Sequence, residues 1–258
     1  MDHSPRRGRI LSLLAEEGTI GVADLAQRLE VSVETVRRDI KALAGRGDIV
    51  RMHGAVGLPS VVSEAPFERR MRENRQAKEA IARLAASTIR DGESIMLDTG
   101  TTTSILARAL LDHRRLTVVT NSSDIARTLA TVNGNKVYMA GGELRSDSGA
   151  ALGFSAIEFA NRFSVDHAII SAGAVNAITG IMDYDLEEAQ FGQAVLARGR
   201  RRVVVTDASK FGQKGLVRVC ALSEFDELIV NSAPPDDLAR ALQTAEVSLR
   251  VCSQDMSQ

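Results

Sequence analysis

Two adjacent arginines, Arg37 and Arg38, lie in a stretch whose apolar residues recur at helical spacing. The apolar residues that we expect to face inward are Val33, Val36, Ile40 and Leu43. The opposite face is then polar, and its arginines could form paired hydrogen bonds to phosphates or guanine edges. The residues of this face that could contact DNA are Ser32, Glu34, Thr35, Arg37, Arg38 and Lys41. Considered alone, the arginine pair is explained equally well by a solvated charged helix.

A second candidate site is the hydroxyl-rich turn at residues 99–103, which follows the apolar residues 95–97 and precedes a helical pattern. Backbone N–H groups, hydroxyls and the positive end of a helix dipole would all favour an anion there, and phosphate is the natural ligand. The turn is neither a P-loop nor a dinucleotide-binding fingerprint. An ordinary helix cap would also account for it.

Polar turns follow several other predicted strands, and they strengthen the phosphate interpretation. Arg145 and Lys210 could each place a positive charge opposite a phosphate, although either alone could be an ordinary surface residue. Carboxylates and amides, including Glu187, could bind the hydroxyls of the same ligand. The predicted ligand-binding residues are Asp98, Gly100, Thr101, Thr102, Thr103, Thr120, Asn121, Gly142, Arg145, Asp183, Glu188 and Lys210. Together they favour a small phosphorylated sugar or polyol.

The elements around the arginine pair predict a helix-turn-helix. Three short helical patterns occur in residues 10–43; residues 17–19 end the first, and Val31 and Ser32 separate the second from the third. Ser32 is a suitable N-cap for the third helix. Residues 48–56 then form two short extended stretches that predict a β-wing, on which Arg51 and His53 could approach the DNA backbone or minor groove.

The rest of the chain predicts a second, larger domain. Residues 57–60 and Pro66 interrupt regular structure, and residues 68–75 are rich in Arg and Glu, as expected of a solvated connecting helix. Strand patterns follow at residues 94–98, 116–120, 136–140, 165–171, 202–206 and 227–231, with helical segments between most of them. This alternation predicts an α/β, doubly wound, mostly parallel sheet. The expected domains are residues 1–57, a linker at 58–76 with a helix, and residues 77–258.

Composition excludes several classes of protein. The chain has 258 residues, of which 44% are hydrophobic and 25% charged, and no apolar run long enough to span a membrane. No secretory signal is visible, so we expect a cytoplasmic protein. Two cysteines and four scattered histidines give no metal-site spacing, and we expect no metal or cofactor. Residues 1–60 hold nine basic and eight acidic side chains, so bulk charge does not predict nucleic-acid binding.

The order of these motifs resembles the DeoR family of bacterial transcriptional repressors. Residues 31–40, with Gly47, Arg51 and residues 53–55, resemble its winged helix-turn-helix. Residues 98–103, 120–121, 141–145, 187–189 and 207–212 resemble its sensor domain, which is similar in fold to ribose-5-phosphate isomerase. The resemblance implies repression of a sugar or polyol catabolic operon, relieved by a phosphorylated metabolite. Residues 141–146, Asp185 and residues 232–235 resemble the glycerol-3-phosphate repressor branch, which makes glycerol 3-phosphate the leading candidate effector.

Two positions depart from the family pattern. The wing has Ala55 where relatives usually have a second glycine, a small backbone restriction. Residues 171–175 read Ser-Ala-Gly-Ala-Val where many relatives and the isomerases have Gly-Ala-Asp, so a candidate general base is missing and we expect no catalytic residue.

Three functions remain open at this point. The first is a ligand-controlled repressor that binds double-stranded operator DNA as a homodimer or homotetramer. The second is a sugar-phosphate isomerase with an accessory DNA-binding domain. The third is an architectural DNA-binding protein whose second domain only forms oligomers, although nine aromatic residues and no Trp offer little for stacking on single strands.

Overall fold

The computed structural model describes residues 5–17, 19–52, 55–57 and 64–252. The chain forms two compact units, one ending at Arg69 and the other beginning at Arg70. The division falls within the stretch 58–76 that the sequence predicts as a linker. That stretch includes the short helix α4 (Phe67–Arg72) and the beginning of α5 (Arg75–Ala86).

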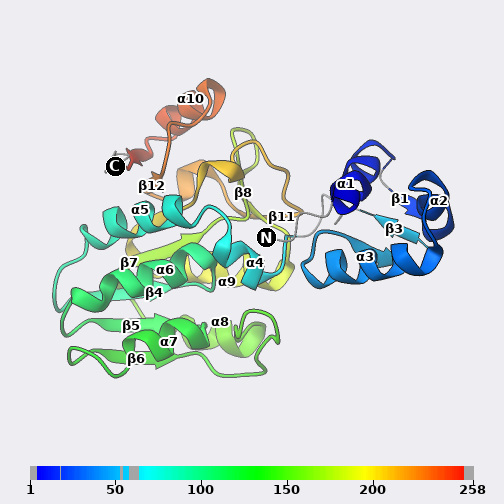
Figure 1. The fold of residues 1–258 in the computed structure, drawn as a ribbon. Coiled ribbons are helices and arrows are strands. Elements are labelled where there is room, and N and C mark those ends of the chain that lie inside the picture. Colours follow the sequence, from blue (N-terminus) through cyan, green and yellow to red (C-terminus); the bar gives the residue numbers. More distant parts are fainter. Residues whose placement is uncertain (1–4, 18, 53–54, 58–63, 253–258) are drawn as a thin grey trace, which may run out of the picture. The chain divides into compact units, whose positions relative to one another are not determined.

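The first unit is a three-helix domain with a small antiparallel sheet (Figure 1). Its helices are α1 (Pro5–Glu17), α2 (Val22–Arg28) and α3 (Val33–Gly45). Its strands are β1 (Thr19–Gly21), β2 (Val50–Met52) and β3 (Ala55–Gly57), in the order β1-β3-β2. The predicted helices and wing are confirmed, and β1 adds a wing strand that the sequence did not reveal. His53 lies outside the described residues.

Local chemistry explains where the third helix begins. Ser32 is the N-cap of α3, and its Oγ accepts a hydrogen bond from the backbone N–H of Thr35 at 3.2 Å. Glu30, in the preceding turn, has φ of 54°, the left-handed conformation that closes a tight connection. Because α2 ends at Arg28, only four residues separate the two helices. This is the geometry of a helix-turn-helix.

The prediction that Val33 faces inward is wrong. Val36, Ile40 and Leu43 are buried as expected, but Val33 is 39% exposed. It is the first residue of α3, and the inward stripe is completed by Asp39 instead, which is 2% exposed.

The second unit contains a parallel seven-stranded sheet in the order β13-β12-β10-β7-β4-β5-β6. Its strands are β4 (Ser94–Leu97), β5 (Thr117–Thr120), β6 (Lys136–Met139), β7 (Val165–Ser171), β10 (Gly199–Val205), β12 (Glu227–Val230) and β13 (Ser248–Val251). Successive strands spread outward in one direction from β4 and in the other from β7. The two adjacent strands therefore form a topological switch point, where ligands bind in folds of this type.

Helices cover both faces of this sheet, which confirms the doubly wound architecture (Figure 1). The helices α5, α6 (Thr101–Ala109) and α7 (Ser123–Leu129) contribute to one buried apolar cluster. The helices α8 (Phe154–Ala160), α9 (Leu186–Leu196) and α10 (Asp236–Thr244) contribute to another. Short 3-10 helices lie at Leu110–Asp112, Ala208–Lys210 and Leu222–Glu224.

A second, antiparallel sheet was not predicted. It consists of β8 (Ala174–Asn176), β9 (Gly180–Asp183) and β11 (Val217–Cys220), in the order β11-β9-β8. Its strands β8 and β9 follow β7 in the chain, and Asp183 at the end of β9 lines a cavity together with Asp98 and Ser171. Among the described residues, no helix combines the length and the apolar character needed to cross a membrane.

Candidate functional site

The outer face of α3 carries the residues predicted to contact DNA. Arg37, Arg38 and Lys41 are exposed, as is Arg51 on β2. The additional members of this surface are Ser32 and Glu34, both exposed, and Thr35, which is half-buried. Glu34 lies 3.9 Å from Arg37, a weak exposed pair that leaves the guanidinium accessible to a phosphate.

An ion-pair cluster on the inward face of α3 holds this helix against α1. The cluster was not predicted from the sequence. Asp39 of α3 accepts hydrogen bonds from Nε of Arg6 at 2.5 Å and from Nε of Arg7 at 3.0 Å, both on α1. Burial by itself would raise the pKa of Asp39, but the two arginines outweigh it and hold that pKa below its ordinary value. The cluster ties α1 to α3, and it explains why these two arginines do not join the exposed basic surface.

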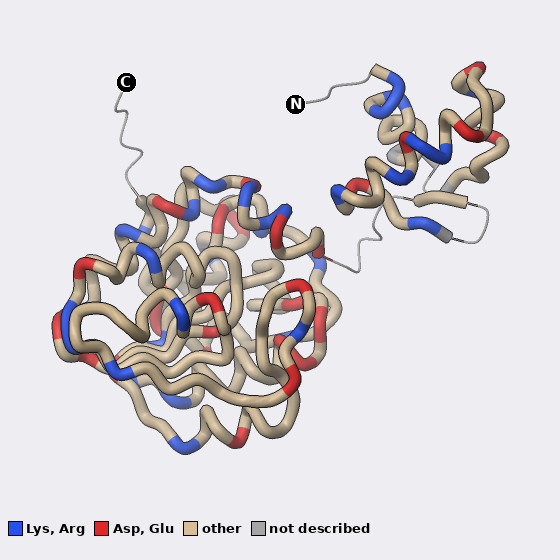
Figure 2. Tube along the Cα trace, turned by 60° about the horizontal axis from the view of Figure 1, so that its bottom comes forward, with Lys and Arg blue, Asp and Glu red and all other residues tan. Residues whose placement is uncertain are grey.

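Basic and acidic residues are interspersed in both units (Figure 2). An attraction to DNA therefore depends on the local arrangement along α3 rather than on a broad positive field.

In the second unit, Asp98 lies at the switch point between β4 and β7. Its Oδ2 accepts a hydrogen bond from the Ser171 backbone N–H at 3.0 Å, and the Ser171 hydroxyl lies 3.4 Å away. Its Oδ1 is buried and has no hydrogen-bond partner among the described residues. Burial raises the pKa of Asp98 to about 7, against the opposing hydrogen bonds from Ser171, and the Asp183 carboxylate adds to the rise. An unpaired buried carboxyl oxygen is costly unless a ligand or water supplies its partner.

A small cavity opens beside Asp98. It is lined by Asp98, Thr99, Asn121, Leu152, Ile170, Ser171, Asp183, Glu188, Phe191, Gly192 and Val219. The structure thus brings together four of the predicted ligand-binding residues: Asp98, Asn121, Asp183 and Glu188. The cavity has a volume of about 10 Å³, enough for a single water molecule. A larger ligand would therefore need the cavity to widen.

The start of α6 forms one wall of this region. A Cβ on Gly100 would lie 1.9 Å from Oγ of Ser171, so no larger residue fits there without a shift. The Thr103 hydroxyl donates to the backbone oxygen of Asp98 at 3.0 Å or of Gly100 at 3.1 Å, and so it is used within the turn. Thr101 and Thr102 are also buried. The turn can therefore offer an anion its first backbone N–H groups rather than the Thr103 hydroxyl.

Asn121 is held in place by both ends of its amide. Its Oδ1 accepts from the Thr99 hydroxyl at 2.9 Å, and its Nδ2 donates to the backbone oxygen of Ala151 at 2.9 Å. Ser171 was not among the predicted site residues, and Thr99 was predicted only as the first residue of the hydroxyl-rich turn. The sequence did indicate both positions, because Thr99 follows the predicted strand at 94–98 and Ser171 ends the predicted strand at 165–171.

Arg145 is bound by carboxylates at the start of α9. Its Nη2 lies 2.7 Å from Asp185 and 3.6 Å from Glu187, and its Nη1 lies 3.6 Å from Glu188. Asp185 is also the N-cap of α9, because its Oδ1 accepts from the N–H groups of Glu187 and Glu188. Burial would raise the pKa of Asp185, but the hydrogen bonds from Arg145 and the helix outweigh it and lower that pKa. Glu188 also lines the Asp98 cavity, so the ion-pair cluster around Arg145 lies next to that cavity.

Other predicted residues lie outside the Asp98 cavity. Thr120 is buried and accepts from the Ser122 backbone N–H at 3.1 Å. Gly142 is exposed with φ of 143°. Lys210 ends the turn after β10 and lies close enough to Lys78 for their charges to interact. The cavity is therefore lined by only some of the predicted ligand-binding residues, and the others lie on the turns around it.

Lys78 is a buried charged residue that the sequence analysis overlooked. Its Nζ donates to the backbone oxygen of Arg70 at 2.5 Å, and the side chain is only 4% exposed. Burial lowers the pKa of Lys78, and the nearby Asp207 carboxylate opposes that change. The burial of Lys78 could have been predicted from the sequence. It lies three residues before Ile81 and four before Ala82, on the same apolar stripe of α5.

Comparisons with known proteins agree with both halves of the chain. Residues 6–62 match the DeoR-like helix-turn-helix domain, and residues 73–232 match the DeoR C-terminal sensor domain. The chain is 31% identical to the glycerol-3-phosphate regulon repressor of Escherichia coli K12 over 98% of this chain and 100% of that protein. It is 34% identical to the HTH-type transcriptional repressor CsqR of the same organism over 98% of this chain and 97% of that protein.

Among solved structures, a ribose 5-phosphate isomerase A from Methanocaldococcus jannaschii is 19% identical, with a TM-score of 0.41 over 55% of this chain and 56% of that one. The two relatives that align over nearly the whole chain and are described above are both named repressors, which disfavours the isomerase alternative. The chain belongs to the DeoR family and is a transcriptional regulator, with a helix-turn-helix domain and a sensor domain, rather than an enzyme.

Proposed function

We propose that this protein represses a sugar or polyol catabolic operon and is released from its operator when a phosphorylated metabolite, with glycerol 3-phosphate as the leading candidate, binds the sensor domain. The observation that carries the effector assignment is the unpaired Oδ1 of Asp98 in the switch-point cavity, next to the cluster around Arg145. The near full-length similarity to a glycerol-3-phosphate regulon repressor supports the choice of effector.

The ligand chemistry divides between the two ends of such an effector. Carboxylate and amide oxygens of Asp98, Asn121 and Asp183 suit hydroxyl groups, which donate hydrogen bonds to them. The phosphate needs cations and N–H donors instead, and Arg145 and the first turn of α6 provide them. Lys210 and the other predicted residues of the surrounding turns would complete the site once the cavity widens.

Arg145 gives this proposal a mechanism. In the structure its guanidinium is held by Asp185, Glu187 and Glu188. A phosphate that takes over these contacts would leave the carboxylates at the start of α9 without their cation. Effector binding would then favour a different position of α9, and operator affinity changes to the extent that the ligand prefers that state.

Replacing Arg145 by Gln should raise the effector concentration needed for half-release from the operator by at least about tenfold. A hydrogen bond to a charged group contributes about 1.5–3 kcal/mol, and one factor of ten corresponds to about 1.4 kcal/mol. Because the substitution also leaves the carboxylates at the start of α9 without their cation, operator affinity without effector should fall toward that of the effector-bound protein. The measurement is a fluorescence anisotropy titration of the protein–operator complex with glycerol 3-phosphate, with Arg127→Gln, an 80% exposed arginine, as the control.

Asp185→Asn provides a companion test with the opposite sign. Asparagine can still cap α9, but it no longer neutralises Arg145, so the effector should release the operator at a lower concentration than in the wild type. An unchanged half-release concentration in both variants would contradict the role given to Arg145.

A further inference from the structure

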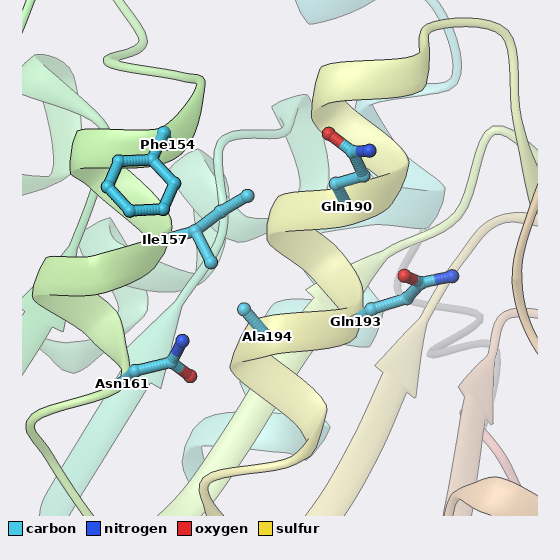
Figure 3. Close-up of a pocket in the computed structure, with 6 residues that line it drawn as sticks. All are labelled: Phe154, Ile157, Asn161, Gln190, Gln193 and Ala194. Carbon is cyan, nitrogen blue, oxygen red and sulfur yellow. The ribbon is translucent and has the colours of Figure 1, made fainter.

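An uncharged groove runs between α8 and α9 on the outer surface of the sensor domain. One side is lined by Phe154 and Ile157 of α8 and by Asn161 at the end of that helix, and the other by Gln190, Gln193 and Ala194 of α9. Figure 3 shows Ile157 and Ala194 at the centre of the groove, with the ring of Phe154 at one end. Phe154 is 79% exposed, an unusual position for an aromatic side chain in a chain with nine aromatics.

The residues that line the groove also differ in charge from the chain as a whole. All six lining residues are uncharged, although a quarter of the chain is charged. Leu186, one helical turn before Gln190 on α9, is 57% exposed and extends the uncharged stripe. An exposed aromatic and a depletion of charged side chains are typical of the centre of a protein–protein interface.

The chemistry of this groove fits a second copy of the same chain. A two-fold axis places the same patch on both partners, so the patch must complement itself. A protruding ring beside an apolar groove does so, because each Phe154 can enter the groove of the other copy. The amides of Asn161 and Gln190 carry both donors and acceptors and can pair with their own copies, whereas a charged side chain there would face its like. The Gln193 amide is used within the chain, because its Nε2 donates to the backbone oxygen of Arg218 at 3.1 Å.

We propose that the groove between α8 and α9 is the interface through which two copies of this chain associate, with Phe154 of each copy seated in the groove of the other. The same helix α9 carries Asp185 and Glu188 at its start. If the proposed effector role of these residues holds, the interface lies on the helix that responds to the ligand. The interface itself does not depend on that role.

Phe154→Glu tests the proposal in the full-length protein. The side chain is exposed, so the variant should fold with an unchanged circular dichroism spectrum. Placing two carboxylates in the interface should raise the dissociation constant of the dimer by at least about 30-fold, the effect expected of a hot-spot residue. Sedimentation velocity over a concentration series measures it, in the absence of DNA and effector, so that the result does not depend on the proposed function.

The matched control is Ile178→Glu, which introduces the same charge at a 91% exposed apolar residue between β8 and β9, away from the groove. Gln190→Glu, at an exposed site in the groove, should weaken association as Phe154→Glu does. Dissociation by both groove variants but not by the control supports the interface. A monomeric wild type, an unchanged assembly with Phe154→Glu, or equal dissociation by Ile178→Glu would overturn it.

Discussion

Arg38→Ala should weaken binding of the full-length protein to its operator by about 30-fold or more. An arginine that contacts a guanine edge or phosphates contributes about 1–3 kcal/mol, and a dimer loses that contact in both half-sites. Arg38 is exposed on α3, whereas the core of the domain is formed by Val36, Ile40 and Leu43 from the opposite face. The thermal unfolding midpoint should therefore not change.

A duplex selected by the wild-type protein from a random library serves as the probe for this measurement. Fluorescence anisotropy at two salt concentrations then gives the affinity of each variant. Arg127→Ala is the control, because this arginine is also exposed but lies on α7 in the sensor domain. Equal affinity of Arg38→Ala and wild type at both salt concentrations would contradict the assignment of α3 as the reading helix.

Asp98→Asn should make the protein more stable than the wild type at pH 8, but not at low pH. The pKa of Asp98 is raised in the folded protein from 3.8 to about 7. Below pH 3.8 the carboxyl is protonated in both states and costs nothing. As the pH rises toward 7 the unfolded chain ionises first, so the folded state loses up to about 4 kcal/mol of relative stability. Asparagine does not ionise and avoids this loss.

Urea unfolding at pH 5 and pH 8 measures the effect. The difference in unfolding free energy between Asp98→Asn and wild type should grow by about 2–3 kcal/mol between these two values. Asp112→Asn, at an exposed carboxylate, should show no comparable change. Parallel pH dependences for Asp98→Asn and wild type would show that Asp98 is not desolvated as the structure indicates.

The parts of the fold that were predictable are those specified by local sequence. Ser32 caps α3 through its own hydroxyl, and short apolar runs at residues 95–97, 118–119 and 168–170, each followed by a polar turn, identify β4, β5 and β7 as buried strands. The last strand, β13, is different. It alternates Leu249 and Val251 with polar residues at the edge of the sheet, and such a short edge strand carries little signal.

The candidate site was predictable where the sheet topology decides it. Carboxyl ends of neighbouring parallel strands meet at one edge, so Asp98 and Asn121 were expected to converge. What the sequence could not reveal are contacts between distant segments. The hydrogen bond from Ser171 to Asp98, the three carboxylates around Arg145 and the pairing of Asp39 with Arg6 and Arg7 all depend on packing of elements far apart in the chain.

We propose that binding of a small organic phosphate to the sensor domain controls the affinity of the protein for operator DNA. A titration of the wild-type protein–operator complex with glycerol 3-phosphate, glycerol, inorganic phosphate and a series of triose, pentose and hexose phosphates tests it most directly. Glycerol 3-phosphate should lower operator affinity by about tenfold or more, whereas glycerol and inorganic phosphate should have little effect. Operator affinity that stays the same with every organic phosphate in the series would show that such ligands do not control DNA binding by this protein.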